Sequence, residues 1–141
     1  MRVRVLRLRL FRPLACLALT GAALFDARCA GCHGAGGEGA AADALVGGRG
    51  SLATPKPVQT VGSYWPYATT LFDYIRRTMP YDAPQSLGPD ETYTLSAYIL
   101  SRNGLLPDDA VLDAGTLAGV RMPNRDGFTA DARPDVPAAG R

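Results

Sequence analysis

Two cysteines and the only histidine of the chain lie within five consecutive residues, Cys29-Ala30-Gly31-Cys32-His33. On a helix, positions i, i+3 and i+4 share one face, so both thiols and the imidazole would point to the same side. This CxxCH spacing is typical of a c-type haem attachment site, in which the thiols bond the vinyl groups and the imidazole reaches the iron. The sequence therefore predicts one covalent haem c, attached through Cys29 and Cys32, with His33 as an iron ligand.

Two other kinds of site use the same residue types. A thioredoxin-like CxxC would need a strand before it in a βαβ unit, and no strand is predicted there. A zinc site needs four ligands, whereas only Cys29, Cys32 and His33 are grouped. Haem attachment is therefore the preferred interpretation.

A second iron ligand is sought by elimination. Because His33 is the only histidine, two histidines of this chain cannot hold one iron. Methionine is the usual partner of histidine and raises the reduction potential. Met79, stiffened by Pro80 and lying between two predicted helices, is the preferred ligand. Met122, Lys56 or an open sixth position remain alternatives.

The aromatic segment Tyr64-Trp65-Pro66-Tyr67 is predicted to line the haem. Trp65 or Tyr64 could donate a hydrogen bond to a propionate while its ring packs on the porphyrin edge. Ordinary core packing is the alternative for each of these rings. Arg76 and Arg77 could pair with propionates, although exposed arginines on a helix are usually solvated.

Helical spacing and breaker residues predict the elements that position these groups. A short helix is expected over 21–33, glycine-rich and proline-rich loops over 34–66, and a helix over 68–78 that ends before Met79 because Pro80 follows. A further helix should begin after Gly88, with Pro89 at its first position, and end at Gly104. No strand is predicted, so the expected fold is all-α, with three to four helices around one haem.

Charge is unevenly distributed along the 141 residues. The first twelve contain five arginines and no acidic residue, while the rest of the chain holds ten basic and all thirteen acidic residues. The body therefore offers no basic patch for nucleic acid. The arginines precede an uncharged stretch over 13–25, which is short for a membrane span but suits the apolar region of a signal peptide.

These observations predict four segments. Residues 1–20 form a signal peptide or N-terminal anchor, 21–104 the haem domain, 105–127 an arm that packs on it, and 128–141 a disordered tail. The apolar run merges with the first predicted helix, so either the segment stays attached as an anchor or the true start of the gene lies elsewhere.

The sequence resembles class I cytochromes c. Gly21 and Phe25 stand eight and four residues before Cys29, as in the first helix of that family, and Tyr98 resembles the aromatic of its last helix. Met79-Pro80 resembles its axial methionine loop. The resemblance implies the class I cytochrome c fold, with the first helix packed on the last.

A narrower resemblance covers most of the body. The segments VGSYWPYATTLFDYIRRTMPYDAPQSL (61–87) and VRMPNRDGF (120–128) are similar to the cytochrome subunit of sulfur dehydrogenase and to cytochromes that accompany sulfite-oxidase-like molybdenum enzymes. This resemblance implies a periplasmic protein that takes single electrons from a molybdenum-cofactor subunit oxidising a sulfur compound and passes them to another cytochrome. A generic respiratory electron carrier and a haem enzyme with an open sixth site are the alternatives.

One stretch departs from the family pattern. Many small cytochromes c have a Pro-x-Leu after the haem motif, and the proline carbonyl orients the histidine ring. Here the stretch reads Asp43-Ala44-Leu45. The sequence therefore leaves the hydrogen-bond partner of His33 open.

Overall fold

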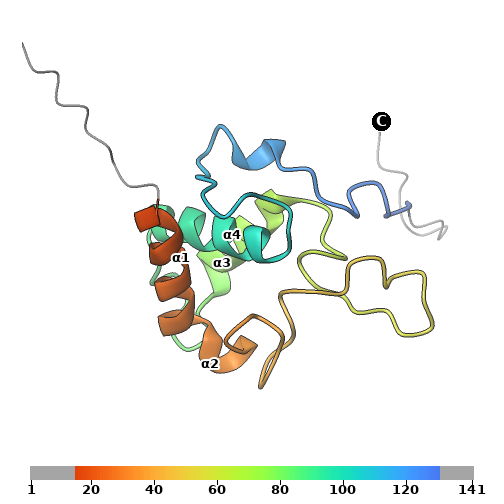
Figure 1. The fold of residues 1–141 in the computed structure, drawn as a ribbon, viewed down its shortest axis with the longest axis horizontal. Helices are drawn as coiled ribbons and strands as arrows, with labels where there is room; N and C mark the ends of the chain where they lie inside the picture. Colours follow the sequence, from red (N-terminus) through yellow and green to blue (C-terminus); the bar gives the residue numbers. More distant parts are fainter. Residues whose placement is uncertain (1–14, 131–141) are drawn as a thin grey trace, which may run out of the picture.

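The computed structural model describes residues 15–130, and side chains over residues 21–130. It contains the α-helices α1 (Ala15–Arg28), α2 (Ala30–His33), α3 (Ala68–Thr78) and α4 (Pro89–Arg102), and the short 3-10 helix η1 (Leu117–Gly119) (Figure 1). There is no strand in this part of the chain. The predicted all-α class is confirmed. Most of the predicted leader, and the tail from residue 131, lie outside the described residues.

The helix predicted over 21–33 is two helices that meet at Cys29. Backbone hydrogen bonds continue through the junction, from the Cys29 amide to the Phe25 carbonyl and from the His33 amide to the Cys29 carbonyl. Cys29 itself leaves helical geometry, with φ −128° and ψ −38°. The axis therefore breaks at the first cysteine, while Cys32 and His33 remain on one helical turn beyond it.

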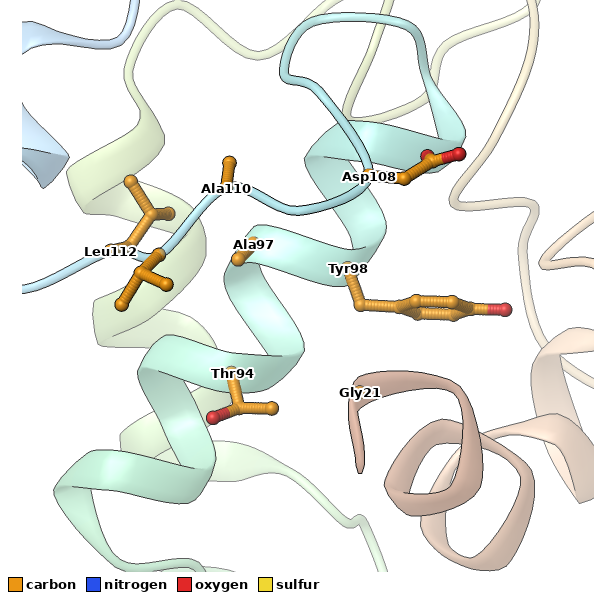
Figure 2. Close-up of a pocket in the computed structure, with 8 residues that line it drawn as sticks. Gly21, Thr94, Ala97, Tyr98, Asp108, Ala110 and Leu112 are labelled. Atoms are coloured by element: carbon orange, nitrogen blue, oxygen red, sulfur yellow. The ribbon is translucent and has the colours of Figure 1, made fainter. Parts of the chain in front are cut away.

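The crossing of α1 over α4 depends on a glycine. A Cβ at Gly21 would lie 3.1 Å from the Tyr98 Cβ, closer than ordinary van der Waals contact. One turn later, the buried Phe25 ring lies 5.2 Å from the Tyr98 ring, centroid to centroid. Figure 2 shows Gly21 of α1 facing the α4 residues Thr94 and Tyr98. A side chain at position 21 would push the two helices apart.

The crossing also borders a small cavity. It has a volume of about 30 Å³, which is room for about one or two water molecules. Tyr98, Asp108 and Leu112 are among its lining residues (Figure 2). It is too small to hold a cofactor.

Helix α3 ends as the sequence predicts. Its last residue is Thr78, and Met79 is extended, with φ −109° and ψ 150°. Proline disfavours helical backbone in the residue before it, so Pro80 explains the stop. Met79 thereby lies in the connection between α3 and α4 rather than on a helix.

Helix α4 begins at Pro89, after Gly88, as predicted. The Glu91 carboxylate accepts a hydrogen bond of 2.8 Å from the Gly88 amide, and Asp90 and Glu91 complement the positive end of the helix. The helix ends at Arg102, and Gly104 follows in the left-handed region at φ 68°. Leu95, Ile99 and Leu100 are its most deeply buried apolar side chains.

The long loop between α2 and α3 is held by hydrogen bonds between its own residues. The Thr60 hydroxyl donates to the Gly47 carbonyl at 2.6 Å, and the Ser63 hydroxyl donates to the Val58 carbonyl at 2.6 Å. Gly48 has φ +71°, and a Cβ there would overlap the Val58 carbonyl oxygen. A side chain is therefore excluded at this turn, which brings 47–48 against 58–63.

The segment after α4 returns over the helices and contributes to the core. Leu112, Leu117, Val120 and Met122 are each at most 7% exposed and belong to the same apolar cluster as Phe25 and Leu100. η1 lies against α3. No helix among residues 15–130 combines the length and apolar character needed to cross a membrane.

Candidate functional site

One large cavity brings together residues from α2, α3, α4 and the connecting loops. Its volume is about 690 Å³, within the range of about 300–1,000 Å³ found for small-molecule and cofactor sites. Its walls are mainly apolar. The apolar lining residues include Leu45, Val61, Leu71, Ile75, Leu87, Leu95 and Ile99.

All three residues of the CxxCH motif that could bind a cofactor line this cavity: Cys29, Cys32 and His33. Neither cysteine forms a disulfide. Burial raises the pKa of the Cys29 thiol to about 11, against a smaller lowering by the Arg28 guanidinium. Without a cofactor, the Cys29 sulfur is therefore a neutral thiol at neutral pH, half-buried at the cavity wall.

The structure supplies the hydrogen-bond partner of His33 that the sequence left open. The His33 Nδ1 atom lies 2.7 Å from the backbone carbonyl oxygen of Asp43. Asp43 is the residue that stands where the family pattern has proline. A carbonyl oxygen is supplied by any residue type, so the departure in sequence leaves this contact intact.

The two candidate methionines lie in different surroundings. Met79 is partly buried and lines the cavity that also holds Cys29, Cys32 and His33. Met122 is 2% exposed, packs within the apolar core, and is not among the residues that line the cavity. Lys56 is exposed and is also absent from the lining. The geometry therefore favours Met79 as the second iron ligand.

The predicted aromatic residues divide in the same way. Trp65 lines the cavity, and its ring lies edge-on to that of Tyr74 on α3, with centroids 5.7 Å apart. Tyr64 is not among the lining residues, and its ring contacts Phe128 instead. Sequence reasoning did not single out Tyr74 or Tyr81, which both line the cavity and are exposed.

The two arginines of α3 are engaged elsewhere. Arg76 donates to the Leu87 carbonyl at 2.9 Å, and Arg77 pairs with Asp73 at 2.7 Å on the exposed side of the helix. Arg28 at the end of α1, Asp43 in the loop after α2 and Asp82 between α3 and α4 are charged residues of the lining. Arg28 also donates to the Ser86 hydroxyl at 3.2 Å.

The cavity and its donors fit a covalently attached haem. Two thiols, an imidazole and a thioether are the groups that bind haem vinyl carbons and iron in c-type proteins. They line one apolar cavity of cofactor size, and the imidazole is already oriented by a backbone carbonyl.

Comparison with known proteins agrees with this interpretation. The family model described as cytochrome c matches residues 18–103. Among solved structures, the crystal structure of the sulfane dehydrogenase SoxCD from Paracoccus pantotrophus contains a similar chain, with 46% sequence identity and a TM-score of 0.79. The match covers 84% of this chain and 59% of that chain, so this chain spans less than two thirds of the length of the protein it resembles. None of the proteins with curated functions matches it.

Proposed function

The chain belongs to the cytochrome c family, whose members carry covalent haem c and transfer electrons, and we propose that it takes single electrons from a molybdenum-dependent dehydrogenase of a sulfur compound. We further propose that it works in the periplasm and passes these electrons to another cytochrome. One haem would be bound per chain. One observation carries the proposal: Cys29, Cys32, His33 and Met79 line the same cavity.

In this proposal Cys29 and Cys32 would hold the haem through thioether bonds, and His33 and Met79 would bind its iron. The bound haem supplies a reversible one-electron iron couple. The chain supplies the orientation of the ligands and their apolar surroundings. The Asp43 carbonyl orients the His33 ring at 2.7 Å, and the apolar walls keep water away from the ligands. No proton has to move, and no substrate has to enter the cavity.

Similarity to known proteins supports a dehydrogenase of a sulfur compound as the electron donor. The similar chain, at 46% identity, belongs to a protein named a sulfane dehydrogenase. The segments 61–87 and 120–128 resemble cytochromes that accompany molybdenum enzymes of the sulfite-oxidase type. Both observations favour a dehydrogenase of a sulfur compound as the electron donor over an unrelated respiratory donor.

The proposal is tested by reduction in the presence of the donor. The chain is produced in cells with a c-type maturation system, purified oxidised, and mixed without oxygen with the molybdenum subunit and a sulfite or sulfane substrate. We expect the absorption bands of reduced haem to appear only when both are present. A Cys29→Ser, Cys32→Ser double variant is the control and should release its haem on extraction with acidified acetone.

Two outcomes would contradict the proposal at different levels. A colourless mature protein with both thiols still titratable would overturn haem binding itself. A red protein that dithionite reduces, but that the molybdenum subunit with its substrate does not, would overturn the proposed donor and leave a general electron carrier.

A further inference from the structure

The segment after α4 contacts the aromatic segment 64–67, although Asn124 and Tyr64 are 60 residues apart in the sequence. The Asn124 side-chain amide nitrogen lies 2.7 Å from the backbone carbonyl oxygen of Tyr64. Because a carbonyl oxygen only accepts hydrogen bonds, the Asn124 amide donates this one. Asn124 is partly buried, so the bond is shielded from competing water.

Two ring contacts stand on either side of this hydrogen bond. The rings of Tyr64 and Phe128 lie 5.2 Å apart in an edge-on arrangement, and the Arg125 guanidinium lies over the Tyr67 ring at 5.1 Å. Met122, just before this group, is anchored in the apolar core at 2% exposure. The arm therefore contacts the residues that flank Trp65-Pro66 on both sides.

Trp65 lies between these contacts and lines the haem cavity. Its ring meets Tyr74 of α3 edge-on, so α3 limits its movement along the cavity wall. The arm limits movement of the Trp65 backbone, because the carbonyl of the neighbouring Tyr64 accepts a hydrogen bond from Asn124. The ring contact with Tyr74 and the hydrogen bond from Asn124 to Tyr64 together fix the position of the Trp65 indole.

The turn that presents Asn124 requires a glycine. The Gly127 amide donates to the Asn124 carbonyl at 3.1 Å and closes the turn. A Cβ at Gly127 would overlap the Asn124 side chain. Any larger residue at position 127 would therefore displace the amide that binds Tyr64.

We propose that Asn124 is a positioning residue of the haem site, which holds Trp65 in the cavity wall through its hydrogen bond to the Tyr64 carbonyl. The arm lies beyond residues 18–103, where the family model matches. This inference rests on the proposed function, because it assumes haem in the cavity. Releasing the segment would admit water into the haem cavity, which would favour the more highly charged ferric state and lower the reduction potential.

Trp65 is the only tryptophan of the chain, so its fluorescence reports on this position alone. In the haem-loaded protein, emission is quenched while the indole stays close to the porphyrin. We expect Asn124→Ala and Gly127→Ala to raise this emission and to shift the reduction potential downward, measured by spectroelectrochemistry. The Gly127 variant keeps Asn124 and disturbs only its position, so it provides a second, independent disturbance.

Arg121→Ala is the matched control. Arg121 lies on the same arm and pairs with Asp126 at 3.5 Å, and both side chains are more than 80% exposed. This variant should keep the emission and the potential of the original protein. Denaturation with urea separates positioning from stability, because a purely structural role would lower the midpoint and leave both native-state signals unchanged.

Unchanged emission and an unchanged reduction potential in the two haem-loaded variants, Asn124→Ala and Gly127→Ala, would overturn the inference. This result would leave the proposed function untouched. Failure of the original protein to bind haem would overturn the proposed function first. The haem band of each variant, measured after removal of unbound haem, tells the two failures apart.

Discussion

The His33 Nδ1 atom lies 2.7 Å from the Asp43 carbonyl oxygen, and this contact determines which ring nitrogen faces the backbone. The carbonyl only accepts, so Nδ1 carries a proton, and Nε2 is the ring nitrogen left to bind a metal. The same contact holds the ring in place. A carboxylate side chain at position 43 takes no part in it.

Asp43→Asn should therefore keep the proposed histidine–iron bond. The backbone carbonyl remains, and only a negative charge beside the cavity is lost, which makes reduction slightly easier and raises the potential by a small amount. Electron paramagnetic resonance of the ferric protein should show the same axial ligands before and after. Loss of the histidine ligand in this variant would show that the carboxylate, rather than the carbonyl, orients His33.

The proposed iron ligand is tested by comparing two methionines. Met79→Ala should abolish the weak far-red absorption band of a methionine–iron bond and lower the potential, because methionine ligation raises it. Met122→Ala should keep the band and instead destabilise the fold by about 2–5 kcal/mol, the usual cost of removing a buried methionine side chain. Absorption spectra and urea denaturation of both variants are the measurements. A band that survives in Met79→Ala and disappears in Met122→Ala would reverse the assignment.

Asn103 ties the loop behind His33 to the end of α4. Its side chain accepts a hydrogen bond from the Gly47 amide at 3.1 Å and donates to the Leu45 carbonyl at 3.1 Å. Removing these bonds in Asn103→Ala should lower the free energy of unfolding by about 1–3 kcal/mol. Gly62→Ala should have a similar effect, because a Cβ at Gly62 would overlap the Asn103 amide.

Gly119→Ala is the control for the glycine substitution, since a Cβ there meets nothing within 4 Å. Urea denaturation of the haem-loaded variants provides the comparison. Equal midpoints for Gly62→Ala and Gly119→Ala would show that the loop does not depend on Asn103.

The helix crossing gives a prediction about stability alone. Gly21→Val places methyl groups against Tyr98, where even a single Cβ lies only 3.1 Å from the Tyr98 Cβ. Overpacking of this kind should destabilise the fold by about 1–3 kcal/mol, while the haem spectrum of the folded protein stays the same. Thermal unfolding followed by circular dichroism measures the effect. A variant as stable as the original protein would mean that α1 and α4 separate without cost.

The sequence predicts the helical elements because their signals are local. Pro80 ends α3 at Thr78, and Gly88 with Pro89 begins α4, and both boundaries follow from the conformations open to proline and its neighbours. The break at Cys29 was missed because the hydrogen bonds continue through it, so the residue pattern over 21–33 is that of one helix. The sequence leaves the hydrogen-bond partner of His33 open because a backbone carbonyl, here that of Asp43, leaves no mark on residue type.

The chemical groups of the site are determined by sequence, because the CxxCH motif places two thiols and an imidazole within five consecutive residues wherever that segment lies. Tertiary structure decided which groups meet them. Packing of the chain between residues 60 and 128 puts Met79 and Trp65 at the cavity, buries Met122 in the core, and sets Asn124 against Tyr64. Such contacts join residues far apart in the chain, and their geometry depends on how whole helices and loops pack, which local residue patterns do not contain.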